Sequence, residues 1–262
     1  MKIGIVGCGT LGRAIAAGLS GHEGVQSIAG STRRGLPIPE LGGVPISSDN
    51  RAVARDADVV LLCVKPFQVE HVSRELAEVL RPEQLVICTA ASVSTAQVRF
   101  WTSERVPVVR AMPNMPCRIG AGMTVLAAGE GATAEHVALA KSLFETLGRA
   151  IAIEERLMDA ATGISGCGPA YAYVVIEALS DAGVKLGLSR EVARVLVAQT
   201  ILGSAKMVLE SAAHPAALKD EVTTPAGCTI DALMELEDGK LRHTLLRAAV
   251  AAADRSATLA SS

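Results

Sequence analysis

The chain has 262 residues, of which half are hydrophobic but only 2% are aromatic, and its formal net charge is −2. Acidic and basic residues are interspersed without a basic run, which argues against nucleic acid or an anionic membrane surface as a partner. The opening stretch MKIGIVGCG lacks the charged and apolar segments of a signal peptide. We therefore expect a soluble, cytoplasmic protein.

The six cysteines and five histidines are scattered along the chain. None of them forms a CxxC, HxxxH or HxH pattern, which are spacings typical of metal sites and redox motifs. This distribution predicts reduced thiols and no catalytic metal.

Residues 1–154 alternate short β-branched runs with helical patterns. Strands are expected in the runs KIGIV, VQSIAG, DVVLLCV, QLVICTA, VPVVRAM, MTVLAA and RAIAI. Because strands separated by one helix length are typical of βαβ units, the pattern predicts an α/β, Rossmann-like domain with a mostly parallel sheet.

Residues 155–262 show almost no strand signal and predict a second, all-α domain. Its expected helices are ERLMDAATGIS, AYAYVVIEALSDAG, REVARVLVAQTILGSAKMVLES and LRHTLLRAAVAAADR. Several of these helices are apolar on more than one face, so they need protein neighbours on several sides. We expect an intertwined homodimer or a higher homo-oligomer.

The segment GIVGCGTLG places Gly7, Gly9 and Gly12 in a GxGxxG frame, with Thr10 and Leu11 between the last two glycines. It follows an expected strand and opens an expected helix, which is the context in which this motif binds the pyrophosphate of a dinucleotide. The alternative is a glycine-rich turn in a flavodoxin-like fold.

The second expected strand ends in Ser31, Thr32, Arg33 and Arg34, where an NAD site would normally have an acidic residue. Hydroxyl and guanidinium groups suit a 2′-phosphate, so NADP(H) is the preferred cofactor and NAD(H) remains possible. The alternative is that the arginines only begin a solvated loop.

Two further loops follow expected strands, at the sheet edge where α/β folds bind ligands. One contains Val64, Lys65 and Pro66, and the other contains Asn114 within AMPNMP. Both are candidate cofactor contacts, and an ordinary turn is the alternative for each.

The stretch TTPAGCT, which contains Pro225, Ala226, Gly227, Cys228 and Thr229, precedes an apolar helical run. A helix that starts here exposes backbone N–H groups that could hold a small carboxylate. The alternative is that the Thr and Pro residues only cap the start of the helix, although capping does not require Gly227.

The segments KDEVTTPAGCTIDALMELE and GISGCGPAY, together with GIVGCGTLG, CVKP and AMPNMP in the same order, resemble the pyrroline-5-carboxylate reductase family over essentially the whole chain. The family usually has Gly where this chain has Ala226, and Ser where it has Cys167.

The resemblance implies hydride transfer from NAD(P)H to the C=N bond of 1-pyrroline-5-carboxylate, giving L-proline in proline biosynthesis. It also implies a composite active site in an intertwined dimer. The TTPAGCT N–H groups would hold the substrate carboxylate, Thr229 would donate to the ring nitrogen, and Asn114 would lie beside the nicotinamide. Thr229 and Asn114 are therefore the candidate catalytic residues.

Three other functions stay open. The enzyme could reduce another cyclic imine acid, as Ala226 suggests, or the chain could be a non-catalytic NADP-binding protein. A β-hydroxyacid dehydrogenase is the weakest alternative, because that class uses an asparagine in its second domain and this chain has none after Asn114.

Overall fold

A computed structural model describes residues 1–260, which form two compact units. The first unit comprises Met1–Cys167 and the end of the last helix from Val250 onward, and the second comprises Gly168–Ala249. Residues 261 and 262, the end of the expected helical domain, lie outside the described part of the chain.

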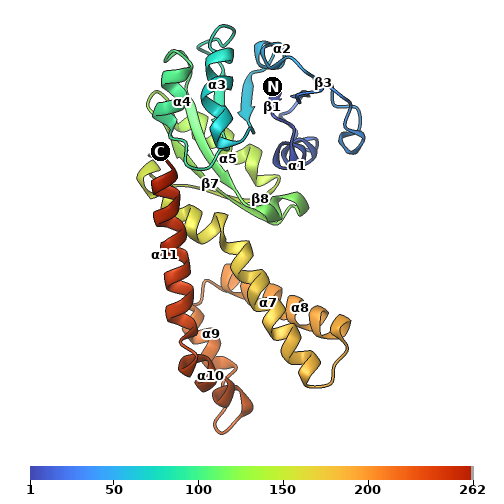
Figure 1. The fold of residues 1–262 in the computed structure, drawn as a ribbon, viewed down its shortest axis with the longest axis vertical. Helices are drawn as coiled ribbons and strands as arrows, with labels where there is room; N and C mark the ends of the chain where they lie inside the picture. Colours follow the sequence, from blue (N-terminus) through green and yellow to red (C-terminus); the bar gives the residue numbers. More distant parts are fainter. Residues whose placement is uncertain (261–262) are drawn as a thin grey trace. The chain divides into compact units, whose positions relative to one another are not determined.

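The first unit contains one eight-stranded sheet in the order β3-β2-β1-β4-β5-β6-β7-β8 (Figure 1). All neighbouring strands are parallel except β6 and β7, which pair antiparallel, so the expected mostly parallel sheet is confirmed. The strands are β1 Lys2–Val6, β2 Ser27–Ser31, β3 Ile46–Ser47, β4 Val59–Leu62, β5 Leu85–Cys88, β6 Val108–Pro113, β7 Gly122–Ala128 and β8 Gly148–Ala152. Only β3 was not expected, because a two-residue strand leaves no pattern in the sequence.

Helices cover both faces of this sheet. They are α1 Thr10–Leu19, α2 Asn50–Arg55, α3 Pro66–Leu76, α4 Thr95–Trp101, α5 Ala134–Glu145 and α6 Met158–Ala161, with short helical turns η1 Pro39–Leu41, η2 Met115–Ile119, η3 Glu155–Leu157 and η4 Thr162–Gly166. Each strand side chain faces the opposite layer from its neighbour, as the period of two in a strand requires.

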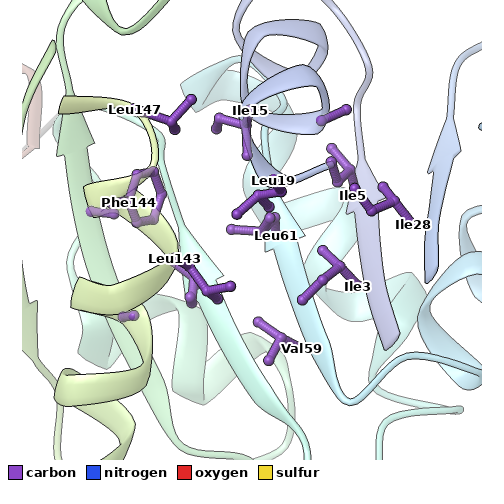
Figure 2. Packing of buried hydrophobic residues seen from close by; sticks show 14 of the residues in the cluster. Ile3, Ile5, Ile15, Leu19, Ile28, Val59, Leu61, Leu143, Phe144 and Leu147 are labelled. Atoms are coloured by element: carbon purple, nitrogen blue, oxygen red, sulfur yellow. The ribbon is translucent and has the colours of Figure 1, made fainter. Parts of the chain in front are cut away.

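One core layer lies under α1 and α5. Figure 2 shows Leu19 of α1 and Phe144 of α5 directed toward Leu61 of β4 and the side chains of β1. The alternate residues of the same strands, such as Val60 and Leu62, pack against α2, α3 and α4 in the second layer. Buried runs on both faces explain why these strands read as continuous apolar segments.

The first unit extends past residue 154, because Met158 of α6 is fully buried against Val125 and Ala127 of β7. A buried arginine, Arg110 of β6, lies 3.9 Å from a carboxylate oxygen of Asp159. The same carboxylate oxygen accepts a 2.7 Å hydrogen bond from Ser256. These contacts explain why the end of the last helix belongs to the first unit. The division into 1–154 and 155–262 remains our proposal for the domain boundary.

The second unit is entirely helical in the described residues, as expected. Its helices are α7 Gly168–Lys185, α8 Arg190–Ser211, α9 Pro215–Glu221, α10 Cys228–Asp238 and the first part of α11 Leu241–Ala260. The expected break at GCGP is a single non-helical residue, Cys167, between the π-helical turn η4 and α7.

This second unit has almost no core of its own. Only Ser180 and Ala193 are buried among its described residues. Large apolar side chains of α8 are exposed, including Val195, Leu196 and Leu202. By length and composition α8 could cross a membrane, but one such helix is weak evidence, because a helix that packs against protein on several sides has the same composition.

Candidate active site

The turn after β1 has the backbone that a dinucleotide motif requires. Gly7 has φ +97°, and a Cβ there would lie 2.8 Å from the Cγ1 of Val64. A Cβ on Gly12 would overlap the carbonyl oxygen of Gly7, so helix and strand pack directly together. Around Gly9, by contrast, no described atom lies within 4 Å of an added Cβ. Gly7 and Gly12 are therefore packed tightly against protein atoms, whereas the space around Gly9 is free for a ligand.

Gly9 is also the N-cap of α1, and no described side chain caps this helix. Thr10 in its first turn is exposed, and Leu11 is half-buried against the core. An open helix start presents unpaired N–H groups and the positive end of the helix dipole to an anion. The geometry suits a pyrophosphate.

Ser31 lies behind this turn. Its side chain is 1% exposed, and its hydroxyl accepts a hydrogen bond from the Gly7 N–H (3.3 Å) and donates one to Asn50 (2.6 Å). Asn50 in turn donates to Glu75 (3.0 Å). The structure thus shows Ser31 as a support of the glycine turn, with its hydroxyl already engaged inside the protein.

The loop after β2 forms a charged depression next to α1. The volume of this depression is about 400 Å³, and it is lined by Arg13, Thr32, Arg33, Arg34, Leu36, Pro37 and Ile38. Sequence reasoning identified Thr32 and Arg33 but missed Arg13. The available signal was its position directly after the third glycine, one helical turn from Gly9.

The loop after β4 leads straight into α3. Lys65 is the N-cap and Pro66 is the first residue of the helix, and both are exposed. The backbone N–H of Lys65 donates to the Gln68 side chain (3.3 Å), while Val64 packs close to Gly7. This loop therefore borders the glycine turn through Val64 and offers the Lys65 ammonium to solvent.

Asn114 joins three segments of the first unit. Its side-chain oxygen accepts a hydrogen bond from the Met123 N–H of β7 (2.9 Å), and its amide nitrogen donates to the Ser165 carbonyl in η4 (3.2 Å). A carboxamide has two N–H groups, so one remains for a ligand. The structure thus gives Asn114 a structural role that the sequence did not predict.

In the second unit, TTPAGCT forms the approach to α10. Gly227 is the N-cap, and no described side chain caps the helix. A Cβ on Gly227 would overlap the Thr224 hydroxyl oxygen, which supplies a packing reason for glycine at this position. Pro225, Ala226 and Cys228 are exposed and Thr229 is half-buried in the first turn. The start of α10 is open to a small anion.

Ala226 has φ +56°, a left-handed conformation that a side chain disfavours. The backbone therefore keeps the glycine-like conformation although the residue is alanine. Alanine instead of glycine at this position raises the free energy of the left-handed conformation and adds a methyl group. The backbone before α10 nevertheless leaves the start of the helix open.

Three cysteines of the first unit are not activated nucleophiles. Burial raises the pKa of Cys8 to about 11, of Cys63 to about 12 and of Cys88 to about 11, so these thiols stay protonated at neutral pH. Within residues 1–260 no group of three or more His, Cys, Asp or Glu side chains could hold a metal ion. The arrangement is suited to binding and orienting ligands through backbone N–H groups, hydroxyls and arginines.

Known protein families match both parts of the chain. Residues 2–92 match the family model of F420-dependent NADP oxidoreductases, and residues 155–259 match the model of the pyrroline-5-carboxylate reductase dimerisation domain. A pyrroline-5-carboxylate reductase from Arabidopsis thaliana is 39% identical over 266 residues, which cover 100% of this chain and 96% of that protein.

Solved structures give the same result. The pyrroline carboxylate reductase of Plasmodium falciparum with NADP bound has a TM-score of 0.89 at 32% identity, and covers 99% of this chain and 98% of its own. The pyrroline-5-carboxylate reductase of Coxiella burnetii has a TM-score of 0.89 at 36% identity, with coverages of 98% and 97%. The chain belongs to the pyrroline-5-carboxylate reductase family.

Proposed function

We propose that this protein is a pyrroline-5-carboxylate reductase, which transfers a hydride from NADPH to the C=N carbon of 1-pyrroline-5-carboxylate and forms L-proline, the last step of proline biosynthesis. The observation that carries the proposal is the full-length match: a relative with that name aligns over 100% of this chain. Both candidate ligand-binding segments of the chain, the glycine turn and the start of α10, therefore fall within the alignment.

NADP(H) is the preferred cofactor in this proposal and NAD(H) a possible one. Gly7, Gly9, Thr10, Leu11 and Gly12 would hold the pyrophosphate at the open start of α1. Thr32 and Arg33 would bind the adenosine end, and Ser31 would hold the turn from behind. Val64, Lys65 and Pro66 would border the cofactor, and the remaining N–H of Asn114 would reach the nicotinamide. When bound, NADPH supplies the hydride.

The protein's own contribution is to hold the imine in place. Pro225, Ala226 and Gly227 would form the substrate-binding loop before α10. The backbone N–H groups of Cys228 and Thr229, in the first turn of that helix, would bind the substrate carboxylate, and the Thr229 hydroxyl would donate a hydrogen bond to the ring nitrogen. A hydrogen bond to the imine nitrogen makes the ring carbon more electrophilic, and the nitrogen takes up a proton from solvent as the hydride reaches that carbon, so orientation would account for most of the rate. In this proposal the hydride transfer uses neither a metal nor a histidine base.

The assembly we propose is a homodimer or a higher homo-oligomer with a composite active site, working in the cytoplasm without nucleic-acid or membrane partners. The match to a dimerisation domain and the exposed apolar side chains of α8 support association between copies of this chain.

The test is NADPH oxidation, followed by the absorbance of the reduced nicotinamide, with 1-pyrroline-5-carboxylate and its six-membered homologue assayed in parallel. Selective turnover of the five-membered ring supports proline synthesis. No turnover of either ring, with NADP⁺ still bound, contradicts the proposed reaction and favours a non-catalytic NADP-binding protein.

A second candidate function is reduction of another cyclic imine acid. The observation that favours it is Ala226, whose methyl group stands in the loop before α10. Preference for the six-membered ring in the same assay would support this candidate. If Ala226→Gly then moved the preference toward the smaller ring, the methyl group would be the specificity determinant.

A further inference from the structure

We propose that Arg13, through its exchangeable ion pair with Glu40, sets the preference of this protein for a 2′-phosphorylated dinucleotide. The inference rests on the proposed use of NADP(H) and adds a selectivity residue outside the loop that follows β2. All the residues concerned lie in the first unit.

Arg13 lies between the glycine turn and the loop after β2. Arg13 belongs to the first turns of α1, where its backbone N–H donates to the Gly9 carbonyl at 2.9 Å. Its side chain nevertheless lines the depression formed with Arg33 and Arg34. One residue thus connects the pyrophosphate turn with the loop after β2, where an adenosine ribose would lie.

Positive charge is concentrated at this depression. Three guanidinium groups gather at one depression, in a chain whose overall charge is slightly negative. Like charges at one place repel each other unless an anion joins them. Thr32 adds a hydroxyl, and Leu36 and Pro37 add an apolar wall suited to a flat base. A phosphate ester on a nucleoside fits this combination.

In this structure the carboxylate of Glu40 already pairs with Arg13. Glu40 of η1 lies 3.8 Å from the Arg13 guanidinium, and 70% of the Glu40 side chain is exposed. Exposed pairs of this kind are weak, so a doubly charged phosphate competes with them readily. The Arg13 Nε–H meanwhile donates to the Cys8 carbonyl at 3.4 Å, which keeps the side chain beside the glycine turn.

The Arg13–Glu40 pair should therefore respond differently to dinucleotides with and without a 2′-phosphate. A dinucleotide with a 2′-phosphate replaces the Glu40 carboxylate with a stronger anion, whereas a dinucleotide with a free 2′-hydroxyl leaves the Arg13–Glu40 pair in place. Loss of Arg13 therefore weakens NADP⁺ binding while NAD⁺ binding stays the same. Loss of the Glu40 charge strengthens NADP⁺ binding.

The experiment measures Kd by calorimetry for NADP⁺, NAD⁺ and 2′,5′-ADP on the full-length protein. We expect Arg13→Ala to raise the Kd of NADP⁺ and of 2′,5′-ADP about tenfold, the loss of about one charge-assisted contact. The Kd of NAD⁺ should stay within about twofold, and the dependence of NADP⁺ binding on salt should become shallower. Glu40→Gln should lower the Kd of NADP⁺ about twofold to threefold.

Arg149→Ala is the matched control, because Arg149 is an exposed arginine of β8 at the far edge of the sheet. It removes the same charge and should leave the NADP⁺ to NAD⁺ ratio unchanged. Arg13→Lys keeps the charge and should give an intermediate Kd for NADP⁺.

The outcomes separate the inference from the proposed function. Equal weakening of NADP⁺ and NAD⁺ in Arg13→Ala would mean that Arg13 only supports the glycine turn, and unchanged NADP⁺ binding would also overturn the inference. If the unmodified protein bound neither dinucleotide, the proposed function itself would fail.

Discussion

The two units of this chain are stabilised in different ways. In the first unit, each central strand is enclosed between two helical layers, and large side chains such as Phe144 and Leu61 are almost fully buried. In the second unit, long helices leave Leu196, Leu202 and Met207 exposed within a single protomer. A hydrophobic effect proportional to buried area can stabilise the first unit alone, whereas the second needs further protein contacts. The chain thus combines a closed α/β core with helices whose apolar side chains are left exposed.

The largest expected effect tests the core of the first unit. Leu61→Ala removes a side chain that is 1% exposed and should lower the free energy of unfolding by about 2–5 kcal/mol, through lost burial and a cavity. Urea unfolding at two protein concentrations measures it. The matched variant Leu202→Ala, at a side chain that is 61% exposed, should have an effect that depends on protein concentration. Equal, concentration-independent losses would show that the second unit is stable without partners.

The second prediction concerns association through α8. Leu196→Asp places a charge among exposed apolar side chains and should shift the protein from an oligomer to a monomer, with a dimer Kd raised at least about 100-fold. Light scattering after size exclusion measures the mass. Phe100→Asp is the control, since Phe100 is an exposed apolar residue of the first unit. A mass that does not change in Leu196→Asp would place the interface elsewhere.

The third prediction separates binding from turnover. Thr229→Ala should lower kcat about 100-fold, because the variant lacks the hydroxyl that we propose donates a hydrogen bond to the ring nitrogen. The Kd of NADP⁺ should not change, since the glycine turn lies in the other unit. Steady-state kinetics and calorimetry give the two quantities. Full activity in the variant would remove Thr229 from the proposed site.

The fourth prediction concerns pH. Burial raises the pKa of Cys88 from 9.0 to about 11, and its side chain is fully buried. Below pH 9 the thiol is protonated in both the folded and unfolded states, so its contribution to stability is complete. Between pH 9 and 11 only the unfolded state loses the proton, so the free energy of unfolding should fall by about 1.4 kcal/mol per pH unit from this group.

Unfolding curves between pH 8 and 11 measure that slope. Cys88→Ala should make the slope shallower, although it also lowers the stability at pH 8 by creating a cavity. Val86→Ala, at a fully buried residue of the same strand that has no titratable group, is the control and should leave the slope unchanged. An unchanged slope in Cys88→Ala would show that the thiol is not a source of the pH dependence.

The smallest expected effect is at Ala226. Glycine adopts φ +56° without the steric cost that alanine has there, so Ala226→Gly should raise the stability of the protein by about 1 kcal/mol or less. Thermal unfolding measures the difference. The same change at Ala193, which is buried inside α8, should be destabilising, because glycine is a poor helix former. A loss of stability at Ala226 would mean that the alanine methyl makes favourable contacts.

Much of the fold could be predicted from the sequence. Runs such as VVLLCV are apolar throughout because β4 is covered on both faces, and the helical half lacks any such strand-like run. The glycine turn was also legible, since a positive φ at Gly7 and a close approach at Gly12 both require glycine. The two-residue strand β3 could not be predicted, because a strand of that length leaves no pattern in the sequence. The antiparallel pairing of β6 with β7 could not be predicted either, because an apolar run does not specify the direction in which its strand pairs.

The sequence by itself determined the two classes of structure, the dinucleotide turn and the family, because periodicity, glycine spacing and motif order are local properties of the chain. Only the tertiary structure decided which polar residues are available to a ligand. Ser31 and Asn114 form hydrogen bonds inside the protein, while Arg13 reaches a depression formed by a loop some twenty residues later. Such partners are distant in sequence, and folding brings them together only through the packing of α1 against the sheet.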